Sequence, residues 1–108
     1  MMSSISEIPN RLSCLSIPIA YRAFNAPAIP PFICYITPTA KTEGADNNTS
    51  ILLLQNATVE LYSKFRNFKL ENKIASIFND VELSISSEYI ESEQMYVTYF
   101  EFEFFCKN

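Results

Sequence analysis

The sequence predicts an α+β fold, with a mainly antiparallel β-sheet of four to five strands packed against helices. Three segments support this prediction. Residues 51–63 alternate apolar and polar side chains over much of their length, the aromatic segment 93–105 alternates Phe with Glu at residues 100–104, and residues 67–80 repeat apolar side chains at helical spacing. Because strands and helices occur in runs and do not alternate strictly, antiparallel pairing is favoured over a parallel sheet.

Length and composition indicate a folded chain that forms a single domain, residues 1–108. Of the residues, 48% are hydrophobic and 19% are charged, which is far from the composition of disordered chains. The formal net charge is -4, so the sequence lacks the basic surface that direct nucleic-acid recognition requires. No apolar run reaches the roughly 20 residues of a membrane helix, and no membrane partner is expected.

The three cysteines, Cys14, Cys34 and Cys106, are odd in number and widely spaced, so no closed disulfide framework is expected. The N-terminus lacks the pattern of a secretory signal, and both observations favour a reducing cytoplasm. Cys34 and Cys106 lie in apolar strand patterns, where a free thiol acts as a small hydrophobe.

A short helix is expected near the N-terminus. Ser3 or Ser4 would cap it, and Leu12 and Leu15 would face the core. Because Pro9 restricts where a helix can begin, this one is expected to be short and interrupted.

Two strands follow, at residues 17–24 and 32–38, joined by the proline-rich connector 26–31. Residues 39–50 form the most polar stretch, contain the only glycine of the chain, Gly44, and are expected to be a loop. A loop of that length more often serves a function than acts as a neutral spacer.

The strand at 51–63 is expected to turn Ala57, Val59 and Leu61 toward the core. Residues 51–54 are apolar on both faces of that strand, which exceeds what a sheet covered on one side needs. This excess indicates a candidate contact with another chain.

The segment 67–80 is the clearest helix, with Asn67 as its cap, and a strand at 81–89 follows it. The apolar residues of the helix fall at i, i+4, i+7 and i+8, which places them on one face: Leu70, Ile74, Ile77 and Phe78.

The last strand has two unlike faces. Val97 and Tyr99 share one face with Glu101 and Glu103, so an isolated chain would expose Val97 and Tyr99 unless a helix or a neighbouring chain covered them. Two interpretations stay open: a central strand kept soluble by its glutamates, or a surface between subunits. The opposite face is predicted to be core: Tyr96, Thr98, Phe100, Phe102, Phe104 and Cys106.

Residues for chemistry are scarce. The chain has no histidine, and its single glycine excludes a glycine-rich phosphate loop. Glu88, Glu91 and Glu93 cluster before the last strand without a nucleophile or a basic partner. The cysteines lack metal-ligand spacing. The expectation is a protein that is not an enzyme, with no catalytic residues, no metal site and no cofactor.

The order of segments resembles a known family. "IPIAYRAF", "PPFICYI", a polar loop with "GADN", "VELYS", a helix and "EYIESEQMYVTYFEFEF" are similar to the small tail-completion proteins of siphophages and Gram-positive prophages, also described as tail terminator or minor capsid proteins. The resemblance spans residues 15–105. It implies a tail-terminator-like fold, a hexameric ring that caps the tail tube, and partners in the tail tube protein and the head-neck connector. It also implies a virion protein that is assembled in the cytoplasm of the bacterial host.

Within such a ring, each copy would use one patch to meet a different patch on the next copy. Two alternatives stay open: a head-completion or connector protein of the virion, and a small monomeric protein-binding regulatory module. The residues expected at the subunit interface are Leu52, Leu54, Val97, Tyr99, Glu101 and Glu103.

Overall fold

The structure is a computed structural model that describes residues 2–23, 28–43 and 52–107. Its elements, in chain order, are α1 (Glu7–Leu12), the 3-10 helix η1 (Ser13–Leu15), β1 (Ile19–Tyr21), β2 (Phe32–Ile36), β3 (Ala40–Glu43), β4 (Leu52–Ser63), α2 (Phe68–Ile77), β5 (Ser84–Ile90) and β6 (Met95–Lys107). The predicted α+β class is confirmed. Within the described residues, however, the sheet has six strands, where four to five were expected.

The sheet runs in the order β1-β2-β4-β6-β5, and β3 pairs with β4 beside this path. Every pairing is antiparallel except that of β1 with β2, which is parallel. β4 pairs with β6 along its whole length, from Leu52 opposite Lys107 to Ser63 opposite Tyr96. These two long strands lie at the centre of the sheet, in a molecule that measures 52 × 27 × 23 Å.

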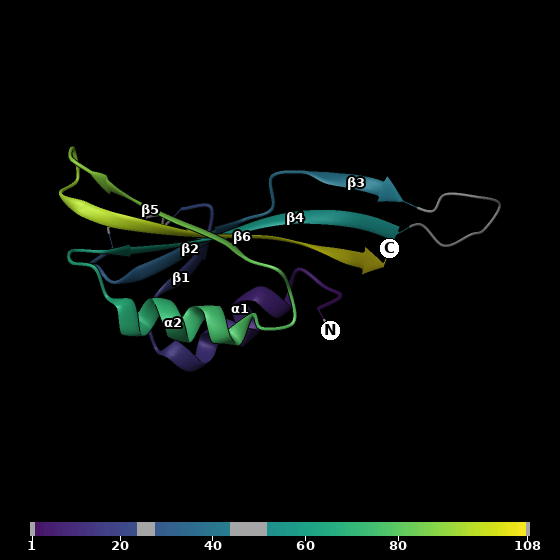
Figure 1. The fold of residues 1–108 in the computed structure, drawn as a ribbon, viewed down its shortest axis with the longest axis horizontal. Coiled ribbons are helices and arrows are strands. Elements are labelled where there is room, and N and C mark those ends of the chain that lie inside the picture. The colour runs from purple at the N-terminus through teal and green to yellow at the C-terminus, as the bar shows by residue number, and fades with distance from the viewer. Residues whose placement is uncertain (1, 24–27, 44–51, 108) are drawn as a thin grey trace.

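Both α-helices lie on the same side of the sheet, and the opposite side carries no helix in the described part of the chain (Figure 1). The core fills the space between the helices and the sheet. The predicted inward face of β4 is confirmed, since Ala57, Val59 and Leu61 are fully buried. The other buried core residues come from the N-terminal segment, the helices, β2 and β6: Met2, Ile8, Leu12, Ile33, Ile74, Phe78, Phe100, Phe102 and Phe104.

The predicted loop at 39–50 contains the strand β3, so that prediction was wrong for residues 40–43. β3 pairs with Leu52–Gln55 of β4, on the same edge that β2 occupies further along. Before β3, the carbonyl of Thr39 accepts the Gln55 Nε2 group at 2.8 Å and the Asn56 backbone N–H at 2.9 Å. The position of this polar strand is therefore set by its pairing with β4 and by the hydrogen bonds to the Thr39 carbonyl, and not by the β-propensity of its own residues. The rest of that loop, with Gly44 and the "GADN" segment, lies outside the described residues.

The caps of the two helices follow different rules. As predicted, Asn67 caps α2, because its Oδ1 accepts the backbone N–H of Leu70 at 3.1 Å. Neither Ser3 nor Ser4 stands at the N-cap of α1, where Ser6 lies without a side-chain cap bond. Pro9 is accommodated near the start of α1, where backbone N–H groups lack intrahelical partners in any case.

Val97 lies on the face of β6 that is turned away from the core and is nevertheless fully buried. Tyr62 of β4 and Glu88 of β5 stand opposite it on the two flanking strands. These long side chains stand on the same face of the sheet as Val97. The expectation that an isolated chain exposes Val97 was therefore wrong, because the long side chains of its own sheet surround it.

Candidate functional site

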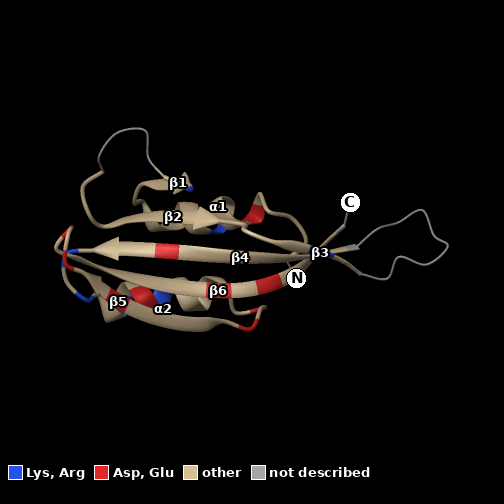
Figure 2. Ribbon diagram, turned by 90° about the horizontal axis from the view of Figure 1, so that it is seen from above, with Lys and Arg blue, Asp and Glu red and all other residues tan. Residues whose placement is uncertain are grey.

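The side of the sheet without helices is an open, acidic face. Figure 2 looks onto it and shows acidic residues on β4, β5 and β6. Glu60, Glu88, Glu101 and Glu103 belong to this face by strand register. Lys41 of β3 and Lys107 of β6 fall on the same face by register. The face therefore presents mainly negative charge.

Two tyrosines fix the carboxylates on this open face. The Tyr62 hydroxyl donates to Glu60 Oε1 at 2.9 Å, and the Tyr99 hydroxyl donates to Glu88 Oε2 at 2.7 Å. Burial, followed by the bond to Glu60, raises the pKa of Tyr62 well above its ordinary value. The bond to Glu88 raises the pKa of Tyr99 to about 12. The hydroxyls thus remain donors to the carboxylates at neutral pH.

Cys34 of β2 stands opposite Glu60 of β4 and does not offer reactive chemistry. It is 4% exposed, and burial followed by the charge of Glu60 raises the pKa of its thiol. A thiol with a raised pKa is a poor nucleophile and a poor metal ligand. Phe32 and Tyr62 stack on the same face, with ring centroids 4.9 Å apart and planes at 15°. Cys34, Phe32 and Tyr62 therefore contribute packing to the open face and not reactive chemistry.

The edge of β6 beyond β5 is the second distinctive feature. Pairing between β5 and β6 stops at Ser84 opposite Glu101, and no described strand continues along that edge toward Lys107. An unpaired strand edge can accept another chain. Two cavities lie beside it.

The first of these cavities is polar and the second is largely apolar. The polar cavity has a volume of about 490 Å³ and is lined by Asn56, Glu82, Ser84, Glu101, Phe102 and Glu103. The second, called the apolar cavity below, has a volume of about 320 Å³. It is lined by Met2, Ser3, Leu54, Asp80, Val81, Glu82, Glu103, Phe104 and Phe105.

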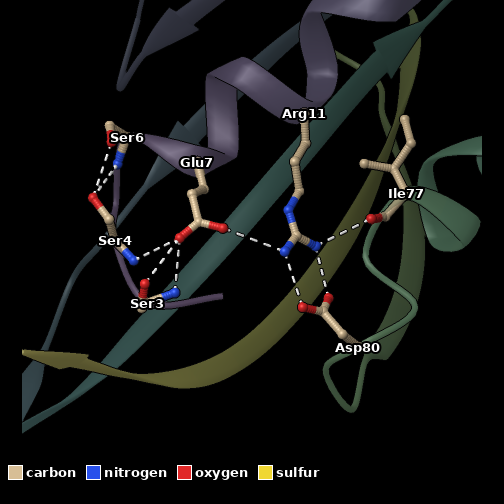
Figure 3. Close-up of polar contacts among 7 residues, drawn as sticks. All are labelled: Ser3, Ser4, Ser6, Glu7, Arg11, Ile77 and Asp80. Carbon is tan, nitrogen blue, oxygen red and sulfur yellow. Dashed lines mark hydrogen bonds and ion pairs between the residues drawn. The ribbon is translucent and has the colours of Figure 1, made fainter. Parts of the chain in front are cut away.

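Arg11 of α1 connects segments of the chain that line the apolar cavity, and Figure 3 shows its hydrogen bonds. Its guanidinium donates to both carboxylate oxygens of Asp80, at 2.6 and 2.9 Å, and to the Ile77 carbonyl at 3.2 Å. These bonds attach the segment after α2, which supplies Asp80, Val81 and Glu82, to α1. The hydrogen bonds from Arg11 lower the pKa of Asp80 far below its ordinary range.

Glu7 fixes the other wall. Its Oε2 accepts the backbone N–H of Ser3 at 2.8 Å and that of Ser4 at 3.1 Å, while its Oε1 accepts Arg11 Nη2 at 3.4 Å. This network, also drawn in Figure 3, holds the N-terminal segment so that Met2 is buried beside the cavity. One cluster of charged groups therefore positions both chain segments that face β6.

The structure brings only some of the predicted interface residues together. Leu54 and Glu103 line the apolar cavity, and Glu101 and Glu103 line the polar one. Tyr99 lies apart from these cavities, half-buried on the open face near Glu88. Val97 is buried and offers no surface. Leu52 begins β4 opposite Lys107, and Ile51, which belonged to the same predicted apolar stretch, lies outside the described residues.

Sequence reasoning missed an exposed aromatic loop between β4 and α2. Phe65 is 78% exposed and Phe68 is 62% exposed, and nearby Ile29, which precedes Pro30, is 85% exposed. Pro30, Pro31 and Phe65 line a shared depression at this end of the molecule. The sequence "KFRNFK" (residues 64–69), which places two aromatic residues among basic residues directly after a strand, is the signal that could have identified this surface.

Within the described residues, no group of three or more Cys, Asp or Glu side chains is placed to hold a metal ion. No helix in the described part of the chain combines the length and the apolar character needed to cross a membrane.

Comparisons with known proteins identify the fold. No family model matches the chain, and no curated protein matches it. Among solved structures, a chain of the virion of a native gene transfer agent particle matches with a TM-score of 0.60, covering 91% of this chain and 84% of that chain. The two chains share a fold. Their sequences are only 8% identical, so the similarity concerns the fold alone.

Proposed function

We propose that this chain is a structural subunit of a tailed-phage or prophage virion, a tail terminator or tail-completion protein. In this proposal, copies of the chain form a ring, expected to be hexameric, that caps the tail tube and joins it to the head-neck connector. The subunit assembles in the host bacterial cytoplasm and remains in the finished virion. It needs no catalytic residue, metal or cofactor for this role.

The observation that carries the proposal is the shared fold with a chain of a gene transfer agent virion, at a TM-score of 0.60 over 91% of this chain. It agrees with the family resemblance of the strand segments, which rests on sequence and is therefore a separate argument. Both point to a virion component that acts through its surfaces.

The surfaces of the molecule are consistent with assembly. A ring needs two different patches on each subunit, so that one copy can meet the next without saturating itself. The described residues form three distinct surfaces. These are the acidic open face, the edge of β6 without a partner strand beside the apolar cavity, and the exposed aromatic loop at the N-terminal end of α2. Phe65 and Phe68 lie three positions apart and are both largely exposed, and contiguous exposed apolar surface of this kind marks sites where proteins associate.

The decisive experiment removes the chain from the particle. Virions produced without it, viewed by electron microscopy, are expected to show overlong tails or tails that lack heads, and a supplied wild-type copy restores normal particles. Normal tails of regular length in its absence would contradict the proposal.

The same images distinguish the proposed tail terminator from the second candidate, a head-completion or connector protein. A head-completion or connector protein shares the size, the acidity and the assembly logic proposed here, but its loss leaves tails of normal length beside heads that have lost their packaged DNA. The two roles also differ in partner: the proposed terminator binds the tail tube protein, whereas a connector of the head binds head proteins alone. Affinity capture from assembling particles measures this directly.

A further inference from the structure

We propose that the exposed aromatic loop of one copy inserts into the apolar cavity of the next copy, and that this is the contact by which the subunits join. The aromatic loop is defined as residues 64–69, with Phe65 and Phe68 as its anchors. The inference rests on the proposed function in one respect, namely that copies of this chain associate, and it names the two surfaces that meet.

The loop is held in a fixed shape by its own contacts. The Ser63 hydroxyl donates to the Phe65 carbonyl at 2.8 Å, and Arg66 makes two bonds of 2.9 Å to the carboxylate of Glu71. The Arg66 guanidinium also lies over the Phe68 ring, 4.5 Å from its centroid. Because the backbone is fixed while Phe65 and Phe68 remain 78% and 62% exposed, the loop is preorganised to bind.

The apolar cavity is a suitable receptor for such side chains. Met2, Leu54, Val81 and Phe104 contribute apolar surface to it, and its volume of about 320 Å³ falls in the range of pockets that enclose ligand-sized groups. It opens beside the part of β6 that has no partner on the β5 side among the described residues. Aromatic anchors that fill such pockets dominate the energies of protein interfaces.

The charges around the two surfaces are opposite. Lys64 and Lys69 flank the aromatic anchors, while Glu82 and Glu103 line the cavity, and all four are exposed. Insertion of the loop would place basic groups beside carboxylates, an arrangement that favours the correct register between partners. Glu91 and Glu93 lie in the turn just before β6. Because Tyr96 near the start of β6 pairs with Ser63, this turn is at the same end of the molecule as the aromatic loop, and neither residue lines the apolar cavity.

The aromatic loop of one copy cannot reach the apolar cavity of the same copy, because the two lie at opposite ends of α2. Phe68 begins α2, whereas Val81 and Glu82 follow its end, and a helix of 10 residues is about 15 Å long. The occupant of the cavity is therefore the loop of a second copy. A contact between two unlike patches is head-to-tail, and it closes into a ring when the rotation between copies allows it.

Paired variants test the contact. Phe65→Glu with Phe68→Glu removes the anchors, and Glu82→Lys with Glu103→Lys places like charges opposite Lys64 and Lys69. Each pair is expected to weaken self-association of the full chain at least tenfold, measured by sedimentation equilibrium. Circular dichroism checks that each variant remains folded. The control Glu91→Lys with Glu93→Lys makes the same charge change outside the contact and is expected not to weaken association.

Two further measurements are specific to a head-to-tail contact. Lys64→Glu with Lys69→Glu, combined in one chain with Glu82→Lys and Glu103→Lys, exchanges the charges and is expected to restore association. The anchor variant, Phe65→Glu with Phe68→Glu, keeps an intact cavity, and the cavity variant, Glu82→Lys with Glu103→Lys, keeps an intact loop. In a mixture of the two, the loop of the cavity variant can insert into the cavity of the anchor variant, and no other contact can form. The mixture is expected to form a one-to-one dimer and nothing larger.

Several outcomes would overturn the inference: a wild-type chain that stays monomeric at every concentration, variants that associate as well as wild type, or a mixture that grows beyond the dimer. The proposed function fails on different evidence. If particles lacking the chain are normal, that function is wrong whatever the association data. If the anchor and cavity variants both restore particles as wild type does, the function stands and the contact is wrong.

Discussion

The guanidinium of Arg11 binds both carboxylate oxygens of Asp80, at 2.6 and 2.9 Å, across 69 positions of the sequence. The same guanidinium reaches the Ile77 carbonyl and Glu7. This pair joins α1 to the segment that follows α2, and both regions border the apolar cavity. The ion pair thus links stability of the helix layer to the shape of a candidate contact surface.

Asp80→Asn is expected to lower the free energy of unfolding by roughly 1–2 kcal/mol at neutral pH, because it removes a charge-assisted pair of hydrogen bonds. The pKa of Asp80 is lowered in the folded chain, so its contribution is fully present above the ordinary value of about 4 and is lost as the pH falls below it. Urea unfolding of both chains at several pH values measures this. The difference between them should shrink below about pH 4; a difference that is constant with pH would contradict the assignment, and Glu93→Gln serves as the exposed control.

Asn67→Ala is expected to destabilise the chain by roughly 1 kcal/mol, because the Leu70 N–H at the start of α2 loses its acceptor. Asn67→Asp is the matched control, since it keeps an oxygen at the same place and adds a charge that favours a helix N-terminus. Thermal unfolding of the three chains is the measurement. An alanine variant as stable as wild type would show that solvent satisfies this N–H equally well.

The features that the sequence alone could predict are those set by local pattern. Alternation predicted the buried face of β4, and an Asn before an apolar helical repeat predicted the cap at Asn67. β3 could not be found this way, because its polar residues are ordered by pairing with β4. Val97 was misjudged for a related reason: alternation gives the face of a residue but not which long side chains surround it. The Arg11 and Asp80 pair, distant in sequence, left no local signal.

Val97→Ala is expected to lower the free energy of unfolding by roughly 1–2.5 kcal/mol, because the side chain is fully buried and its loss leaves a cavity. Self-association should be unchanged, since no part of Val97 reaches the surface. Denaturant unfolding and sedimentation equilibrium on the same sample separate the two effects. A variant of unchanged stability and weakened association would return Val97 to the subunit interface, where the sequence had placed it.

Glu88→Gln is expected to lower the pKa of Tyr99 from about 12 toward the ordinary value of about 10, because the bond to the Glu88 carboxylate is the main cause of the rise. The raised pKa means that the folded chain holds the Tyr99 proton more tightly than the unfolded chain. The resulting stability is complete below about pH 10 and is lost as the pH rises through about 12. Ultraviolet absorbance of tyrosinate follows the titration, and Tyr99→Phe identifies the step. Glu93→Gln, in the turn before β6, should leave this step in place; an unchanged Tyr99 step in Glu88→Gln would show that burial and not the hydrogen bond controls this hydroxyl.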